Sequence, residues 1–154
     1  MRYKKNENIA VRGGRSNALV ILDNINKFKN YGKERNTLSI PTTRLSAYIK
    51  FGCISCREVW HRFVNILGKK SDLVKQLIWR EFYYNILYRH PETLSVDFSK
   101  KNLKENYSKI PWLTLGSIDG HQKKNWRAWC TGMTGFPIVD ACQRELITSG
   151  FMHN

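Results

Sequence analysis

The feature that most constrains the fold is a series of apolar residues at helical spacing, introduced by residues that favour the start of a helix. Ser55 and Glu58 form an S-x-x-E capping box ahead of an apolar series that Gly68 ends. Ser71 caps a second, longer helix, which ends before Pro91 because the residue preceding a proline is pushed out of the α region. No segment alternates apolar and polar residues as a half-buried strand does, so the sequence predicts an all-α fold.

Further helices are predicted on both sides of this pair. Apolar residues recur at helical spacing over residues 18–28, which indicates one amphipathic helix. Trp126 and Trp129 are expected on a short helix. Pro137 suits the first position of a last helix, and Gly150 follows the end of that helix.

The charge of the chain limits its partners. The formal net charge is +14, and the first fifty of the 154 residues hold 11 Lys and Arg against 3 Asp and Glu. This excess suits a phosphate backbone, from which basic side chains release condensed counterions. A solvated basic face with no such partner is the alternative that charge alone leaves open.

The cysteines and the hydropathy indicate the compartment. Cys53 and Cys56 have C-x-x-C spacing, but eleven residues separate Cys130 from Cys142, and no histidine stands at a zinc-finger offset. We therefore expect structural thiols in a reducing compartment and no metal. No apolar run approaches the roughly 20 residues of a membrane span. The sequence thus predicts a soluble, intracellular protein without a membrane partner.

One helical face carries the most distinctive chemistry. Gln76, Trp79, Arg80 and Tyr83 follow one another at spacings of three, one and three residues, which places them on one side of a helix. An indole, an amide and a guanidinium together can face a base and a phosphate. A core helix with Trp79 buried and Arg80 paired to an acid is the alternative. The sequence contains no G-x-S-x-G, P-loop, H-E-x-x-H or G-x-G-x-x-G pattern.

Five segments occur in the order typical of one family: TTRLS at 42–46, IKFG at 49–52, QLIWREFY at 76–83, WCTGMTGFPIVDA at 129–141 and GFMHN at 150–154. Through them the chain resembles the photolyase/cryptochrome family, from about residue 13 to the last residue. The resemblance implies the front portion of that family's helical domain, which binds flavin adenine dinucleotide (FAD).

The resemblance also implies roles for individual residues. The TTRLS loop would bind the FAD phosphates through hydroxyls and backbone amides. The implied cofactor-binding residues are Tyr31, Thr42, Thr43, Leu45, Ser46 and Arg80. Trp79 matches the tryptophan that stacks on a flipped pyrimidine dimer, and Gln76 stands where many dimer-repairing members carry a glutamate. Arg35 and Asn154 resemble residues that contact DNA, and Trp112 has a weaker match to an electron-transfer tryptophan.

The expected domain organisation is a basic tail at 1–12 and a partial FAD-binding and DNA-binding domain at 13–154. The antenna-chromophore α/β domain and the C-terminal half of the helical domain are expected to be absent. Three functions follow from the resemblance. The first is a photolyase-like fragment for light-driven repair of UV-damaged DNA, inactive alone or completed by a second chain. The others are a basic DNA-binding module without flavin and a cryptochrome-like photoreceptor fragment.

Overall fold

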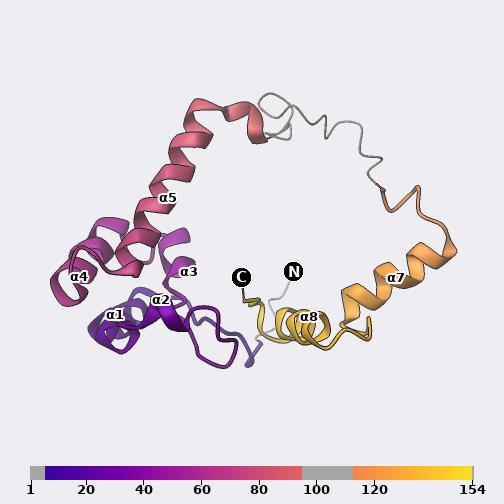
Figure 1. Ribbon diagram of the computed structural model, residues 1–154, viewed down its shortest axis with the longest axis horizontal. Coiled ribbons are helices and arrows are strands. Elements are labelled where there is room, and N and C mark those ends of the chain that lie inside the picture. The colour runs from indigo at the N-terminus through magenta and orange to yellow at the C-terminus, as the bar shows by residue number, and fades with distance from the viewer. Residues whose placement is uncertain (1–5, 95–112, 154) are drawn as a thin grey trace. The chain divides into compact units, whose positions relative to one another are not determined.

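A computed structural model describes residues 6–94 and 113–153 of the chain (Figure 1). It divides the chain into two compact units, each considered by itself below. The N-terminal unit is Val11–Asn102, and the C-terminal unit combines Met1–Ala10 with Leu103–Asn154. Within the described ranges every regular element is a helix, which confirms the predicted all-α class.

The N-terminal unit contains five α-helices and two short 3-10 helices among its described residues. These are α1 (Arg15–Asp23), η1 (Ile25–Phe28), α2 (Tyr31–Glu34), α3 (Leu45–Lys50), α4 (Cys56–Leu67), α5 (Asp72–Arg89) and η2 (Pro91–Leu94). Helices α4 and α5 pack together, α1 contacts α3, and α2 contacts α5.

The prediction of one helix over residues 18–28 is wrong. Helix α1 ends at Asp23, and the chain tightens into η1 after Asn24. The Asn24 side chain donates a hydrogen bond to the Val20 carbonyl oxygen, at 2.9 Å, where it competes with the helical backbone pattern. The tightened turn carries the fully buried Ile25, and η1 contacts α4. Burial of Ile25 therefore accompanies the break in the helix.

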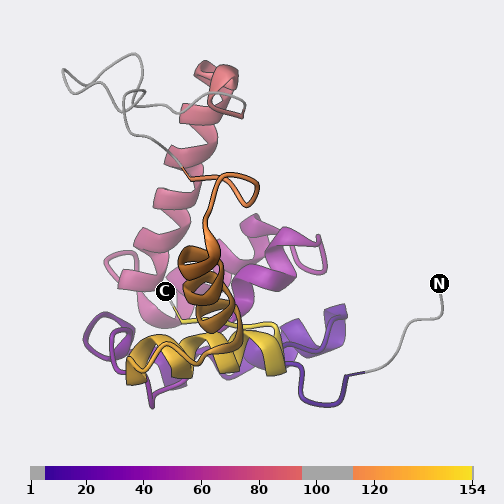
Figure 2. The ribbon, with the colours of Figure 1, turned by 90° about the vertical axis from the view of Figure 1, so that its right-hand side faces the viewer.

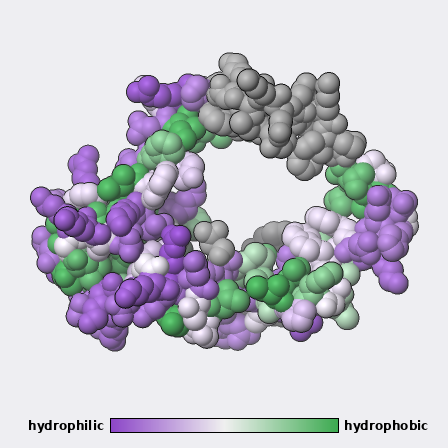
Figure 3. All heavy atoms as spheres, in the orientation of Figure 1, coloured by the Kyte–Doolittle hydropathy of each residue, from purple (hydrophilic) through white to green (hydrophobic). Residues whose placement is uncertain are grey.

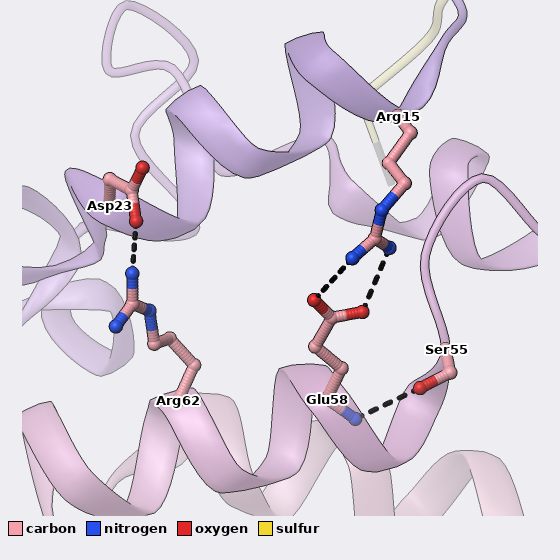
Figure 4. A network of polar contacts seen from close by, with 5 residues as sticks. All are labelled: Arg15, Asp23, Ser55, Glu58 and Arg62. Carbon is pink, nitrogen blue, oxygen red and sulfur yellow. Dashed lines mark hydrogen bonds and ion pairs between the residues drawn. The ribbon is translucent and has the colours of Figure 1, made fainter.

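The hydrogen bonds by which Ser55 and Ser71 are predicted to cap α4 and α5 are confirmed. Ser55 Oγ accepts a hydrogen bond from the Glu58 backbone N–H at 3.0 Å, and Ser71 Oγ accepts one from the Val74 N–H at 3.3 Å. The Glu58 carboxylate also accepts two hydrogen bonds from the Arg15 guanidinium, at 2.8 and 2.9 Å. Figure 4 shows this bidentate pair joining α1 to α4.

A second ion pair, between Asp23 and Arg62, joins the same two helices further along α1 (Figure 4). Between the helices of this unit lies one hydrophobic core. Its buried members are Ala18, Leu22, Ile25, Leu45, Tyr48, Ile54, Val59, Phe63, Leu73, Val74 and Leu77. The core uses only the first part of α5, because none of these residues lies beyond Leu77.

The outer part of α5 extends past its neighbours, as Figures 1 and 2 both show. Its large side chains are accordingly exposed, and Figure 3 shows apolar groups over this helix. The exposed members are Ile78, Trp79, Phe82, Tyr83, Tyr84 and Tyr88.

The C-terminal unit is built on α7 (Gly120–Thr131) and α8 (Pro137–Ser149), which pack against each other. Both helices were predicted, and both are confirmed. Pro137 is the first residue of α8, and Gly150 ends it with a φ of 71°. Ile138, Leu146 and Ile147 on α8 are exposed.

Part of the predicted basic tail is anchored to this unit. Asn6 Nδ2 donates a hydrogen bond to the Thr148 carbonyl oxygen at 3.0 Å, and the Ala10 N–H donates one to Ser149 at 2.9 Å. Residues 6–10 therefore belong to the C-terminal unit, whereas the Arg12 carbonyl oxygen accepts a hydrogen bond from the Tyr48 hydroxyl of the N-terminal unit.

Candidate functional site

The loop at residues 42–46 joins irregular chain to the start of α3. Arg44 takes a left-handed conformation, with a φ of 53°, and precedes the first residue of the helix. Thr43 Oγ1 accepts a hydrogen bond from the Leu45 N–H at 3.3 Å, and the Leu45 side chain is buried in the core. Thr42 and Thr43 are half-buried, and Ser46 is exposed. The loop is thus anchored by Leu45 and offers hydroxyls beside it.

Tyr31 and Arg35 lie at the two ends of α2. Tyr31 is half-buried against the core, and its carbonyl oxygen accepts a hydrogen bond from the Arg35 N–H at 2.9 Å. The Arg35 side chain is exposed. Helix α2 contacts α5, and a Cβ added to Gly32 would collide with the carboxylate of Asp72 in the first turn of α5. This close approach fixes α2 against the helix that carries Trp79.

The aromatic face of α5 is partly open to solvent. The Trp79 ring meets Phe82 edge-on, with centroids 5.4 Å apart, and lies 6.2 Å from the tilted ring of Tyr83. Trp79 is 53% exposed, so the alternative in which it is a buried core residue is wrong. Gln76, one turn earlier, is half-buried. An indole held by two other rings and open on one side can stack on a planar ligand.

Arg80 has two partners on its own helix. Its Nη1 donates a hydrogen bond to Glu81 Oε1 at 2.6 Å, and its guanidinium lies 4.5 Å from the centre of the Tyr84 ring. The pairing of Arg80 with an acid, which was part of the core-helix alternative, is therefore present although Trp79 is exposed. Tyr84 was not predicted to matter. The sequence signal for this contact is that Tyr84 comes four residues after Arg80, because side chains four residues apart on a helix are neighbours and a guanidinium can lie over an aromatic ring.

The described candidate residues all lie in the N-terminal unit, which brings α2, the 42–46 loop and α5 into one body. Trp112 and Asn154 fall outside the described residues. Over the described ranges, no group of three or more His, Cys, Asp or Glu side chains could hold a metal ion. The four cysteines are free thiols, all of them half-buried. A search of the described helices likewise finds none long and apolar enough to cross a membrane.

Comparison with known proteins places the chain among photolyases and cryptochromes. The chain is 33% identical to a deoxyribodipyrimidine photo-lyase from Agrobacterium fabrum over 149 residues, which are 92% of this chain and 29% of that protein. It is 33% identical to the photo-lyase of Alkalihalophilus pseudofirmus over 132 residues, 83% of this chain and 25% of the relative. Cryptochrome-2 from Gallus gallus is 32% identical over 93% of this chain and 25% of its own length.

Solved photolyase structures are also similar to this chain. A bacterial class III photolyase from Agrobacterium tumefaciens superposes with a TM-score of 0.73 at 31% identity, over 92% of this chain and 28% of the other. An archaeal photolyase from Sulfolobus tokodaii, solved with two FAD molecules, superposes with a TM-score of 0.72 at 28% identity. This match covers 98% of the present chain and 31% of the archaeal chain. The chain thus spans between a quarter and a third of the length of these relatives.

The family described as the FAD binding domain of DNA photolyase matches residues 73–154, more than half of the chain. This match contains α7, α8 and all of α5 except its first residue, Asp72. With the photolyase and cryptochrome relatives, it confirms the resemblance read from the sequence motifs. The chain belongs to the photolyase/cryptochrome family, as part of its helical FAD-binding domain.

Proposed function

We propose that this chain is the part of a DNA photolyase-like flavoprotein that faces both the FAD phosphates and UV-damaged DNA, for light-driven repair of pyrimidine dimers. The observation that carries the proposal is the exposed indole of Trp79, beside Arg80 on α5, in a chain of this family. A flat ring next to a guanidinium suits a flipped base next to a phosphate. The relatives named deoxyribodipyrimidine photo-lyase support this reaction.

FAD is the proposed cofactor, because the donors around α3 fit its diphosphate. Hydroxyl groups at 42, 43 and 46 stand beside the first backbone N–H groups of α3, which have no acceptor within the helix. Bound FAD would supply the light absorption and electron transfer that amino-acid side chains lack. The residues proposed to hold it are Tyr31, Thr42, Thr43, Leu45, Ser46 and Arg80. Neither a metal nor an antenna chromophore belongs to the proposal.

UV-damaged DNA is the proposed partner. Trp79 would stack on the flipped lesion, and Gln76, one turn earlier on α5, would contact it through its amide. Arg35 and Asn154 are proposed to contact the DNA, and Trp112 to pass electrons toward the flavin. We also propose an intracellular, reducing location, which the four free thiols support.

A second polypeptide is the other proposed partner. Ile138, Leu146 and Ile147 are exposed on α8, and several large rings are exposed on α5. Exposed apolar side chains gathered on a helix favour a contact with another protein. A chain that covers these faces would complete the flavin site.

Two other functions have support from specific observations. A cryptochrome-like photoreceptor fragment is favoured by the cryptochrome relatives and by Gln76, which stands where many dimer-repairing members have glutamate. A DNA-binding module without flavin is favoured by the net charge of +14.

The first test is the cofactor content of protein purified in the dark. Absorbance between the near ultraviolet and the blue, followed by heat release and identification of the cofactor, should reveal FAD. If the protein is colourless, the same measurement is repeated with a candidate chain for the α5 and α8 faces. Absence of FAD in both preparations would overturn the flavoprotein proposal.

DNA binding then separates the three functions. The photolyase proposal predicts preference for dimer-containing over undamaged DNA, increased by FAD. A module without flavin predicts affinity that falls steeply with salt and is indifferent to FAD and to the lesion. A photoreceptor predicts FAD retention without dimer preference or light-dependent repair.

A further inference from the structure

Two tryptophans on α7 form a stacked pair that the proposed flavin and lesion site does not use. The rings of Trp126 and Trp129 have centroids 5.1 Å apart and planes inclined by 29°. They are three residues apart on the helix, so they lie on one face. Each remains 44% exposed although they cover part of one another. The pair therefore presents a broad aromatic surface to solvent.

The charged residues of α7 all have one sign. Helix α7 contains Lys123, Lys124 and Arg127, all exposed, and no Asp or Glu between Gly120 and Thr131. Lys123 is three residues before Trp126 and therefore borders the indole pair, and Arg127 is four residues after Lys123 and lies next to that cation on the helix. In Figure 3 the surface over α7 is largely hydrophilic. Such a surface attracts an anion that also carries flat rings.

The acid that directly precedes α7 in the sequence, Asp119, forms hydrogen bonds within the cap of this helix. Asp119 Oδ1 accepts a hydrogen bond from the Gln122 N–H at 2.8 Å, and Gln122 Oε1 accepts one from the Asp119 N–H at 3.0 Å. This capping box fixes the start of α7, and Gly132 ends the helix in a left-handed conformation. Both ends are thus defined, and the pair is carried on a fixed helix that packs on α8.

We infer that α7 is a stacking platform for the unpaired bases of a nucleic acid, with Trp126 and Trp129 contacting bases and Lys123 and Arg127 contacting phosphates. Aromatic side chains within a basic surface are the arrangement by which proteins bind single strands without reading their sequence. The inference goes beyond the proposed function, because it involves neither FAD nor the α5 face. It assigns this chain a second nucleic-acid contact, for undamaged strands.

The experiment compares two short labelled strands of equal length and charge, an undamaged oligothymidylate and an abasic strand, by fluorescence anisotropy. The full chain is used in the Trp79→Ala background, which removes the stacking side chain of the proposed lesion site. Adding Trp126→Ala and Trp129→Ala should weaken binding of the oligothymidylate roughly fivefold to a hundredfold. Binding of the abasic strand should change less than twofold, because the phosphate contacts remain.

Conservative variants keep the test valid if the alanine variants lose structure. Trp126→Phe and Trp129→Phe keep flat rings and should retain most of the preference for the base-containing strand. Lys123→Ala and Arg127→Ala should each lower the slope of log affinity against log salt by about 0.7. The control Lys50→Ala, on α3, should leave the preference for bases unchanged.

Three results would overturn the inference. They are an equal loss of affinity for both strands, no loss for either, and no measurable binding of the oligothymidylate by the parent protein. None of these bears on FAD content or lesion preference, so the failure of this inference and the failure of the proposed function are distinguishable.

Discussion

The carboxylate of Asp140 accepts two hydrogen bonds from Thr134, one from its backbone N–H at 2.7 Å and one from its hydroxyl at 2.6 Å. The Gly135 N–H donates a third, at 3.0 Å. Asp140 is in the first turn of α8 and is only 7% exposed. These bonds tie the turn that follows α7 to the start of α8. They matter because the described large apolar residues that are buried all lie in the N-terminal unit.

Asp140→Asn is expected to destabilise the C-terminal unit selectively. The amide is a weaker acceptor than the carboxylate, and it presents an N–H₂ group toward N–H donors. The amides of α7 and α8 should exchange hydrogen faster, and Tm should fall by several degrees. The control Asp23→Asn removes an exposed ion pair with Arg62 and should have little effect. Equal effects of the two variants would contradict the assigned role of Asp140.

Stability is expected to fall in acid because two carboxylates are stabilised in their charged forms. The Thr134 hydroxyl is the main cause of a lowered pKa at Asp140, and the Arg15 guanidinium is the main cause at Glu58. A lowered folded-state pKa adds stability above the unfolded-state pKa of about 4, and that stability is lost as pH falls through the folded-state pKa. Thermal unfolding measured between pH 6 and pH 2 checks this. Asp140→Asn should flatten the profile, and an unchanged profile would contradict the prediction.

Gly132→Ala and Gly150→Ala form a matched pair. Both glycines have positive φ, 65° and 71°, at the ends of α7 and α8. A Cβ at Gly132 would lie 2.8 Å from the Asp140 carbonyl oxygen, whereas one at Gly150 would meet nothing within 4 Å. Gly150→Ala should therefore cost about 1–2 kcal/mol of backbone strain, and Gly132→Ala roughly 2–5 kcal/mol. Denaturant unfolding gives both values, and equal costs would rule out the close contact.

Trp79→Ala is expected to reduce the preference for dimer-containing DNA about tenfold, through loss of base stacking. Tyr88→Ala is the control, since Tyr88 is an exposed aromatic residue on the same helix. Anisotropy with damaged and undamaged strands, in the presence of FAD and of any required partner chain, measures the effect. A similar loss in both variants would mean that α5 binds through general aromatic surface and not through Trp79.

Arg80→Lys is expected to lower FAD affinity roughly tenfold, because an ammonium group cannot reproduce the planar, multidentate contacts of a guanidinium. Arg89→Lys, at the end of the same helix, keeps the charge and should leave FAD affinity unchanged. Fluorescence titration with FAD gives the dissociation constant of FAD for each variant. Unchanged affinity in Arg80→Lys would remove Arg80 from the proposed site.

Much of the candidate site could be read from the sequence because it depends on local spacing. Gln76, Trp79 and Arg80 share a face wherever residues 76–83 form a helix, and Thr43 binds an amide two residues along the chain. The partners of the Arg80 side chain are harder to predict from the sequence. Glu81 and Tyr84 are both within four residues of it, but spacing alone does not reveal which neighbour a long side chain contacts.

The sequence by itself determined the all-α class, the caps at Ser55 and Ser71 and the start of α8 at Pro137, since each depends on hydrogen bonds or backbone angles within a few residues. The tertiary structure decided what depends on distant neighbours. The helix breaks at Asn24 where Ile25 is buried in the core. The Arg15 guanidinium donates hydrogen bonds to the carboxylate of Glu58, forty-three residues further along the chain. The tertiary structure also decided which side chains stay exposed, because the burial of Trp79 or Trp126 depends on packing between helices, which no local sequence pattern encodes.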